Sequence, residues 1–529
     1  MSEASPPPPI SDIDERRRVL RSNAGAVRTI ASAVEGTLGP KGLDVMLVDR
    51  YGEVTITNDG STILGKIDAQ HPASRLLIHA AQAQDEEVGD GTTTATVLAA
   101  ALVEEGVDHI LRGVPAMKVV EGMRAGIAAA VEWMNGAAER VEGLADPRLP
   151  AAARVSARGE GTPARLAVEA AAIVPQDRLL HDPAFRLGEC VVAKEGAEDA
   201  VFAGLLIDKE RMNRQMPRQL SGARMLVVAD ALEPEKIDDE ALATESGFRR
   251  YTALREEFEA NVRKLIDLGV NFVAVERGVD EVAEELLTEG GVMVLRRLGR
   301  RDIAALVDHC GAKPVMRAGL RRGAEEIAAA LGRAEEIAED ERLGYVSIRG
   351  GGGSPAATIL VGGGTAEVKE ERRRIAHDAA AAVQATLRGG LLPGGGAAEM
   401  GAIPAVVACR DRLAGMAVYG AEAVIAALRR PLAQIVANAG FNPLEKVAHV
   451  AAEQAAKGNA GLAVDCDTGE VVDMPAAGIV DPALVKTAAL RTAGEIAEAI
   501  LKISVVIRMR AAGAEAKETE TGASSVTAV

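Results

Sequence analysis

The stretch Asp85–Leu98 places a carboxylate, Asp90, between Gly89 and Gly91 and directly before three hydroxyl residues, Thr92–Thr94. Glycine lets the backbone approach a ligand closely, because it has no side chain. The apolar run that follows predicts a helix with Asp90 as its N-cap. The free N–H groups of a first helical turn suit an anion such as phosphate. Because Mg²⁺ binds one or two carboxylates together with phosphate oxygens, this stretch predicts a site for phosphate and magnesium.

The same residues also fit a simpler structure, an N-capped helix after a tight turn, since glycine loops are common. A second pattern, Gly60–Lys66, fits the GxxxxGK signature of P-loop ATPases and kinases. Ile67 follows it, where that signature needs a Ser or Thr to bind Mg²⁺. We therefore interpret this match as a coincidence and keep a P-loop-type ATPase or kinase only as an alternative.

Hydrophobic periodicity predicts the elements that must position these residues. Residues from about 11 to 142 show mostly helical patterns of Ala, Val and Leu, and this texture returns after about residue 396. One hairpin interrupts the first helical stretch, with strands predicted at 45–48 and 54–57. The last residues, 511–529, are small and polar, which predicts a disordered tail.

The middle of the chain has a different texture. Between about residues 208 and 353, short apolar runs alternate with helical patterns, which predicts a small α/β unit. The predicted strands are 224–228, 271–275 and 292–295. A run of four glycines, Gly350–Gly353, marks the end of this unit.

Composition limits the class of protein. A chain of 529 residues is expected to form more than one domain. Aromatic residues make up only 2%, so the core must consist mostly of Ala, Val, Leu and Ile. The net charge of −17 argues against nucleic acid or an anionic membrane as a partner. Four cysteines without a CxxC pair predict a reducing, cytoplasmic location, and no apolar run is long enough to predict a membrane helix.

Four motifs together resemble the nucleotide-binding segments of the chaperonins, the ATP-driven double-ring protein-folding machines. They occur in the order found in that family, and the resemblance extends from about Ile10 to about Arg508. The motifs are Thr37–Gly42, Thr57–Gly60, Val88–Thr96 (VGDGTTTAT) and Leu392–Glu399. Four ordered motifs are much more specific than one glycine loop.

The resemblance implies that the chain binds ATP and Mg²⁺, with K⁺ as a further candidate ion. It also implies a role for each matching residue. Asp90 matches the Mg²⁺ ligand, and Asp59 and Asp378 match the pair that handles the attacking water. The positions that match nucleotide contacts are Leu38, Gly39 and Pro40 (phosphate loop), Gly60, Gly91, Thr92, Thr93 and Thr94 (phosphate cradle), and Gly395 and Asp481 (adenosine).

Asp378 matches a helix of the family's intermediate domain, in the segment Arg374–Ala379. The resemblance implies that it reaches the γ-phosphate only when that domain swings toward the nucleotide, so that a hinge motion gates hydrolysis. Taken alone, Asp378 fits an ordinary solvated position on a helix. Another position departs from the family: Glu160 stands where thermosome-like chains usually carry a Lys, and Arg158 is the nearby candidate to replace it.

The implied fold class is multidomain, α and α/β, with the three-domain layout of chaperonins. A mostly helical equatorial ATPase domain would take residues 1–143 and 397–529, including the tail. A hinge-like intermediate domain would take 144–206 and 356–396. The α/β apical domain, which holds client protein, would take 207–355. The order of helical and α/β textures along the chain is consistent with this layout.

The branch of the family is indicated by Ile207–Met212, His71–Pro72 and Val485–Thr487, which resemble thermosomes and their eukaryotic cytosolic relatives. That branch needs no separate co-chaperonin, because a helical protrusion near 233–268 forms a built-in lid. An apolar face recurs there every three or four residues. We expect the second half of this helix to pack on the sheet of its own domain, and Phe248 and Tyr251 in its first turns to form the lid contacts. Asp481, where Glu is common, favours the bacterial group III branch.

The resemblance also implies partners. We expect a homo-oligomer of two stacked rings of about eight subunits that encloses non-native polypeptides and opens and closes with ATP. The alternative is a ring scaffold that does not cycle. Asp59, Asp90 and Asp378 argue against that alternative, because a scaffold has no need of the hydrolytic carboxylates.

Overall fold

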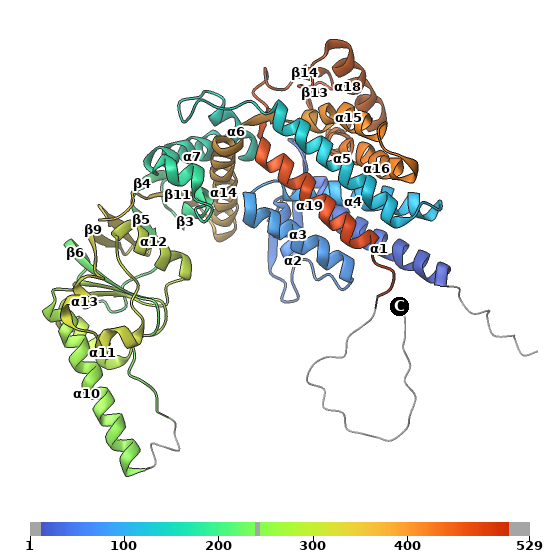
Figure 1. Ribbon diagram of the computed structural model, residues 1–529. Helices are drawn as coiled ribbons and strands as arrows, with labels where there is room; N and C mark the ends of the chain where they lie inside the picture. Colours follow the sequence, from blue (N-terminus) through green and yellow to red (C-terminus); the bar gives the residue numbers. More distant parts are fainter. Residues whose placement is uncertain (1–11, 238–243, 507–529) are drawn as a thin grey trace, which may run out of the picture. The chain divides into compact units, whose positions relative to one another are not determined.

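The computed structural model describes residues 12–237 and 244–506 (Figure 1). The predicted tail and residues 238–243 of the predicted protrusion lie outside these ranges. The chain forms two compact units. The first contains Met1–Glu160 and Ala381–Val529, and the second is the continuous segment Gly161–Ala380. The chain therefore leaves the first unit once and returns to it.

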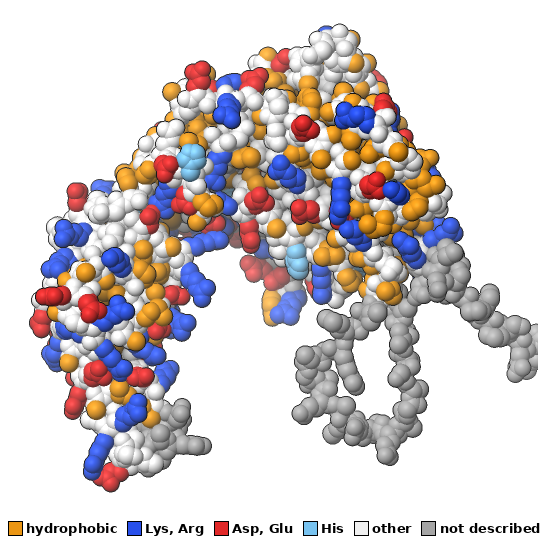
Figure 2. All heavy atoms as spheres, in the orientation of Figure 1, with side chains coloured by type: hydrophobic (Ala, Val, Ile, Leu, Met, Phe, Trp, Pro, Cys, Tyr) orange, Lys and Arg blue, Asp and Glu red, His pale blue; other side chains and the backbone are white. Residues whose placement is uncertain are grey.

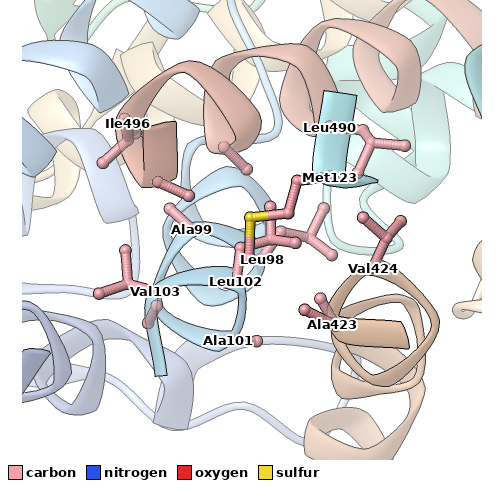
Figure 3. Close-up of a cluster of buried hydrophobic side chains, with 14 of the residues drawn as sticks. Leu98, Ala99, Ala101, Leu102, Val103, Met123, Ala423, Val424, Leu490 and Ile496 are labelled. Atoms are coloured by element: carbon pink, nitrogen blue, oxygen red, sulfur yellow. The ribbon is translucent and has the colours of Figure 1, made fainter. Parts of the chain in front are cut away.

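The first unit is a helical bundle around α4 (Thr92–Leu111). Every residue from Ala95 to Val103 is buried, so this part of α4 is enclosed on all sides, and all but Thr96 are apolar. Figure 3 shows Leu98 and Leu102 of α4 in one cluster with Met123 of α5 (Ala116–Ala137). The other helices in contact with α4 include α1 (Asp12–Val34), α3 (Pro72–Val88), α16 (Val418–Leu428), α17 (Arg430–Asn438) and α19 (Ala483–Leu501).

Shorter elements complete the first unit. The predicted hairpin is confirmed: β1 (Val45–Val48) pairs antiparallel with β2 (Val54–Thr57). Two further antiparallel pairs join β12 (Leu391–Pro393) to β15 (Val480–Pro482), and β13 (Leu462–Val464) to β14 (Val471–Asp473). The remaining helical segments are η1 (Glu35–Thr37), α2 (Gly60–Lys66), α6 (Leu149–Ser156), α15 (Ala397–Arg410), η4 (Gly415–Ala417) and α18 (Pro443–Lys457).

The second unit contains a six-stranded sheet in the order β5-β10-β9-β6-β7-β8. Its strands are β5 (Leu205–Ile207), β6 (Gln219–Val228), β7 (Phe272–Val275), β8 (Met293–Leu295), β9 (Gly332–Asp340) and β10 (Tyr345–Arg349). The three strands predicted from sequence are confirmed as parts of β6, β7 and β8. β6 begins earlier than predicted, because its first half pairs antiparallel with β9 while its last residues pair parallel with β7. The predicted α/β unit is therefore present.

Helices cover both faces of this sheet. α10 (Glu245–Asp267) and α11 (Glu281–Glu289) pack on one face, and α12 (Arg300–Cys310) packs on the other. Phe258, Val262 and Leu265 of α10 are buried, as expected for its second half, whereas Phe248 is 61% exposed. Figure 2 shows Lys and Arg side chains interspersed with Asp and Glu side chains over this region.

A three-stranded sheet, β3-β11-β4, forms a separate part of the second unit, with β3 (Val191–Glu195), β4 (Ala200–Ala203) and β11 (Ala357–Gly363). Its remaining helical segments are α7 (Gly161–Ile173), α8 (Gln176–His181), η2 (Leu187–Cys190), η3 (Arg317–Arg321), α13 (Ala324–Ala328) and the start of α14 (Ala366–Gly389). Within the described residues, every helix is too short or too polar to cross a lipid bilayer.

Candidate nucleotide-binding site

The two glycines around Asp90 both adopt the left-handed conformation and form the tight turn expected before α4. Gly89 ends α3 with φ 76°, and Gly91 begins α4 with φ 81°. A Cβ atom at Gly91 would lie 2.7 Å from Cγ1 of Val485, so a side chain there would collide with α19. The sharp turn between α3 and α4 therefore requires glycine, and it presents Asp90 at the start of α4.

The prediction that Asp90 is the N-cap of α4 is wrong. Gly91 is the N-cap, and it has no side chain to bond the amides of the first turn. The Asp90 carboxylate accepts the N–H of Gly91 (2.6 Å) and the hydroxyl of Ser156 (2.7 Å). The physical reason is that the left-handed Gly91 is inserted between Asp90 and the helix, and the Asp90 carboxylate bonds Gly91 and Ser156 instead. The first turn of α4, at Thr92–Thr94, is consequently left without a side-chain cap from its N-cap residue, which suits an anion.

A second predicted loop meets the start of α4. A Cβ atom at Gly60 would lie 2.3 Å from Oγ1 of Thr93 and 3.0 Å from Oγ1 of Thr92. The loop that contains Asp59 and Gly60 therefore adjoins the threonine cradle, although about thirty residues separate the two along the chain. This proximity is what the resemblance implied for a shared phosphate site.

Asp59 is the N-cap of α2. Its carboxylate accepts the N–H groups of Ser61 (3.3 Å) and Thr62 (2.8 Å) and the hydroxyl of Thr62 (2.5 Å). These bonds fix the carboxylate beside the cradle, while its role in handling water stays a prediction. The helix also argues against the P-loop alternative: residues Gly60–Lys66 are helical, whereas a P-loop must hold its amides free in a loop around phosphate.

The predicted phosphate loop, Leu38, Gly39 and Pro40, is held from α17. The side-chain amide of Asn438 donates to the carbonyl oxygens of Glu35 (2.9 Å) and Leu38 (2.8 Å). Gly39 has φ 86°, and a Cβ atom there would lie 3.1 Å from Ile435 of the same helix. Sequence analysis did not identify Asn438, because nothing in local spacing pairs it with a loop about four hundred residues earlier.

The two positions predicted near adenosine, Gly395 and Asp481, lie on adjoining segments. β12 leads into the glycine turn that contains Gly395, and β15 contains Asp481, which pairs with Leu392. The Asp481 carboxylate accepts a bond from Nζ of Lys486 (2.7 Å). The same Nζ lies 2.9 Å from Oε1 of Glu399, in the first turn of α15. Lys486 and Glu399 were recognised only as parts of motifs and not as site residues.

The electrostatics of Asp90 suit a cation. Burial, and then the nearby carboxylates Asp481 and Asp85, raise the pKa of Asp90 above its ordinary value, although the bonds from Ser156 and Gly91 oppose this shift. A cation at Asp90 would relieve the repulsion among these carboxylates. The described residues contain no cluster of three or more His, Cys, Asp or Glu side chains arranged around a metal. The residues present therefore fit Mg²⁺ bound jointly by Asp90 and phosphate oxygens, and not by a protein cage.

Asp378 lies on α14 in the second unit, as the resemblance implied for a helical position. Its Oδ1 atom lies 3.4 Å from Nδ1 of His377, and its side chain is partly buried. The loops that contain Asp59 and Asp90 belong to the first unit. The approach of Asp378 to these loops therefore stays a prediction.

The segment that departs from the family begins beside Asp90, since Ser156 bonds its carboxylate. Arg158 has φ 55°, which is uncommon for a residue with a side chain, and Gly159 follows with φ 89°. Both Arg158 and Glu160 are exposed. The structure thus brings this segment to the site, while whether Arg158 replaces the usual Lys stays a prediction. Sequence analysis quoted Ser156 within this segment but gave it no role.

Comparison with known proteins identifies the family of this chain. The sequence profile of the TCP-1/cpn60 chaperonin family matches residues 30–511. A thermosome subunit of Pyrococcus abyssi is 32% identical over 525 residues, which cover 96% of this chain and 94% of that protein. Thermosome subunit alpha of Thermoplasma acidophilum is 33% identical over 516 residues, covering 93% and 92%.

A solved structure gives the same answer for the fold. The crystal structure of a group III chaperonin in the open state matches with a TM-score of 0.79 and 43% sequence identity. The match covers 94% of this chain and 100% of that one. It spans both units, so the likeness is not confined to the nucleotide loops. The chain therefore belongs to the TCP-1/cpn60 chaperonin family and has the chaperonin fold.

Proposed function

We propose that this chaperonin binds ATP with Mg²⁺ at the start of α4 and uses hydrolysis to open and close a chamber around non-native polypeptides. ATP hydrolysis coupled to protein folding is the activity of its family. The main observation in favour of this nucleotide site is the close approach of Gly60 to Thr93, three residues after Asp90. Two separate loops thereby border one helix start that receives no side-chain cap from its N-cap residue.

Each group around this helix start has a chemical task in the proposal. The amides and hydroxyls of Thr92–Thr94 bind phosphate oxygens, and Gly39 lets its loop approach them. Mg²⁺ would supply positive charge between the phosphates and Asp90. Ser156 and the Gly91 amide hold the Asp90 carboxylate in place. Gly395 and Asp481 border the adenosine, and K⁺ is a further candidate ion near the phosphates.

Hydrolysis needs a carboxylate that orients or deprotonates water. We assign this task to Asp59 and Asp378. Asp59 is fixed by α2, whereas Asp378 belongs to the second unit and would arrive with a hinge motion. In this proposal the three-domain division given above holds, and the intermediate domain brings Asp378 to the nucleotide. Turnover would then follow closure of the site.

The hairpin β1–β2 supports assembly into rings. One set of its apolar side chains is exposed, including Met46, Val48, Ile56 and, at its turn, Tyr51, which is 79% exposed, whereas Val45 and Leu47 pack against the core. An apolar patch on a two-stranded hairpin indicates a surface that a partner covers. We propose that a neighbouring subunit covers it in two stacked rings of about eight, in the cytoplasm, with the built-in protrusion and no separate co-chaperonin as the lid.

A combined measurement tests this function. Purified protein is assayed for Mg²⁺-dependent ATP hydrolysis and, in the same preparation, sized by chromatography and imaged by negative-stain microscopy. We expect turnover by a large double-ring particle. A large ring without turnover would support the scaffold alternative, and a small particle with turnover would contradict the chaperonin cycle.

A further inference from the structure

A buried ammonium group joins three elements next to Asp90. Nζ of Lys486, on α19, lies 2.7 Å from Oδ2 of Asp481 on β15, and 2.9 Å and 3.2 Å from the two carboxylate oxygens of Glu399 on α15. An ammonium group has three protons. These contacts to two carboxylates hold the Lys486 ammonium group between Asp481 and Glu399.

Burial makes the three charges interdependent. The Lys486 side chain is 9% exposed and that of Glu399 only 2%, whereas Asp481 keeps 22% of its side chain exposed. An unpaired charge in such a place is strongly unfavourable, so Glu399 and Lys486 need each other. Burial lowers the pKa of Lys486, but the carboxylates Asp481 and Glu399 together outweigh it, so that this pKa is raised and the ammonium group keeps its charge at neutral pH. Of the three groups, only Asp481 has appreciable surface for a ligand.

This arrangement fixes one carboxylate oxygen of Asp481 and leaves the other to bond elsewhere. The backbone of Asp481 is held as well, by its pairing with Leu392 in β12. The same strand leads into the glycine turn before α15, whose first turn provides Glu399. Lys486 thus ties the helix after the glycine turn to the strand of Asp481. A ribose hydroxyl needs an acceptor held in this manner, because a carboxylate free to rotate would lose rotamer entropy on binding.

We propose that Lys486, anchored by Glu399, is a positioning residue that fixes Asp481 to accept the ribose hydroxyls of the bound nucleotide. The inference rests on the proposed function, since it takes Asp481 as a nucleotide contact. Lys486 also offsets the charge of Asp481, which lies close enough to Asp90 to affect its pKa. A polyanionic nucleotide would otherwise meet a site with an additional uncompensated carboxylate.

The experiment compares the affinity of the assembled protein for ADP with its affinity for 2′,3′-dideoxy-ADP, by isothermal titration calorimetry. The analogue lacks both hydroxyls that Asp481 would accept. In the wild type we expect it to bind about tenfold more weakly or worse, the scale of a hydrogen bond to a charged group. Asp481→Asn should reduce this ratio toward one.

The variants that test Lys486 are chosen so that the protein still folds. Lys486→Met alone leaves the buried carboxylate of Glu399 without its partner, so it is combined with Glu399→Leu, which replaces the buried pair with apolar groups. This double variant keeps Asp481 and should lose the preference for ADP over the analogue. The control is Glu399→Gln, whose side chain can still hold Lys486 on Asp481 and should retain the preference. Thermal unfolding and ring size verify that each variant is assembled.

The outcomes separate the two proposals. If the wild type binds ADP and the analogue equally, or if Asp481→Asn keeps the preference, the ribose contact of the proposed function is wrong. A different result would overturn only the role of Lys486. In that case the wild type and Glu399→Gln prefer ADP and Asp481→Asn does not, so the ribose contact stands. The folded double variant nevertheless retains the full preference, so Lys486 does not position Asp481. The inference would be supported if the double variant loses the preference for ADP while Glu399→Gln retains it.

Discussion

Two long helices, α4 in the first unit and α10 in the second, contrast in how they use their surfaces. They contain 20 and 23 residues, but α4 is buried on all sides over its middle, whereas α10 buries one face of its second half and exposes its first turns. A helix enclosed by other helices cannot shift without disturbing its neighbours, so it suits a fixed phosphate site. A helix with an exposed beginning suits contact with a changing partner.

The largest effect should come from the enclosed helix. Leu102→Ala removes a fully buried side chain from the centre of α4, where neighbouring helices have little room to collapse. We expect a loss of about 2–5 kcal/mol in the free energy of unfolding. The matched change on α10, Phe248→Ala, should alter it by less than about 0.5 kcal/mol, since that side chain is exposed. Denaturant titration followed by circular dichroism measures both, and equal losses would contradict the comparison.

The second prediction asks whether the two units cooperate in catalysis. Asp378→Ala removes a carboxylate of the second unit and leaves the threonine cradle of the first intact. Turnover should fall on the order of 10²-fold or more, as for other positioned general bases, while ATP still binds. Arg373→Ala, an exposed change one turn earlier on α14, is the control and should hydrolyse ATP normally. Normal turnover in Asp378→Ala would show that ATP hydrolysis does not need the Asp378 carboxylate.

The third prediction concerns Asp90. Asp90→Asn should weaken Mg²⁺-dependent ADP binding by about tenfold or more, since even groups behind a metal ligand act on this scale. Lowering the pH should weaken the same binding in the wild type, because the raised pKa of Asp90 means that it gains a proton above the usual range for Asp. Titration calorimetry with and without Mg²⁺ measures the effect, with the exposed Asp68→Asn as control. Unchanged Mg²⁺ dependence would leave Asp90 with a purely structural role.

Although Asp90→Asn should weaken nucleotide binding, it should raise the stability of the nucleotide-free protein. A carboxyl whose pKa is raised by folding contributes stability only while it is protonated, and this contribution is lost as pH rises through its folded pKa. At pH values above its folded pKa, the charged Asp90 therefore disfavours the nucleotide-free fold, because burial and the carboxylates Asp481 and Asp85 oppose its charge. Without nucleotide, the variant should melt at a higher temperature than the wild type. A lower melting temperature would mean that its bonds to Ser156 and Gly91 outweigh the repulsion.

The sequence predicted those features of the two helices that depend on neighbouring residues. The tight turn at Gly89 and Gly91, the hairpin before α2 and the buried second half of α10 all follow from local spacing and periodicity. The sequence did not predict features that depend on distant residues. Ser156 reaches Asp90 from 66 residues away and helps to hold its carboxylate away from the cap position.

The same limit applies to the rest of the site. Asn438 holds the phosphate loop, and Lys486 joins Glu399 to Asp481. Asn438 is 400 residues from Leu38, and Lys486 is 87 residues from Glu399, so only the fold brings these partners together and no spacing rule predicts their bonds. Motif resemblance located the segments that form the site, but it did not identify the polar side chains that hold them together.

The smallest effect on stability should come from the start of α10, together with a specific loss of function. Phe248→Ser combined with Tyr251→Ser removes one exposed and one half-buried apolar side chain. The change at Phe248 should alter the free energy of unfolding by less than about 0.5 kcal/mol, and the change at Tyr251, which contacts Arg255, by about 1 kcal/mol. ATP hydrolysis and ring size should also stay unchanged, since the proposed nucleotide site and the hairpin lie in the other unit. If these residues meet their counterparts in neighbouring subunits over the chamber, each closure buries apolar surface worth roughly 25 cal/mol per Å². The variant would lose that contribution at every subunit of a ring.

The readout is the protection of an unfolded client from added protease during ATP cycling. The double variant should protect its client less than the wild type does, while Arg250→Ser, an exposed polar change in the same turn, should protect it normally. Full protection by the double variant would mean that the chamber is closed by other residues. Equal loss of protection in Arg250→Ser would instead mean that this turn acts through its charge. Only a loss confined to the apolar substitutions supports a lid that closes by burying these two side chains.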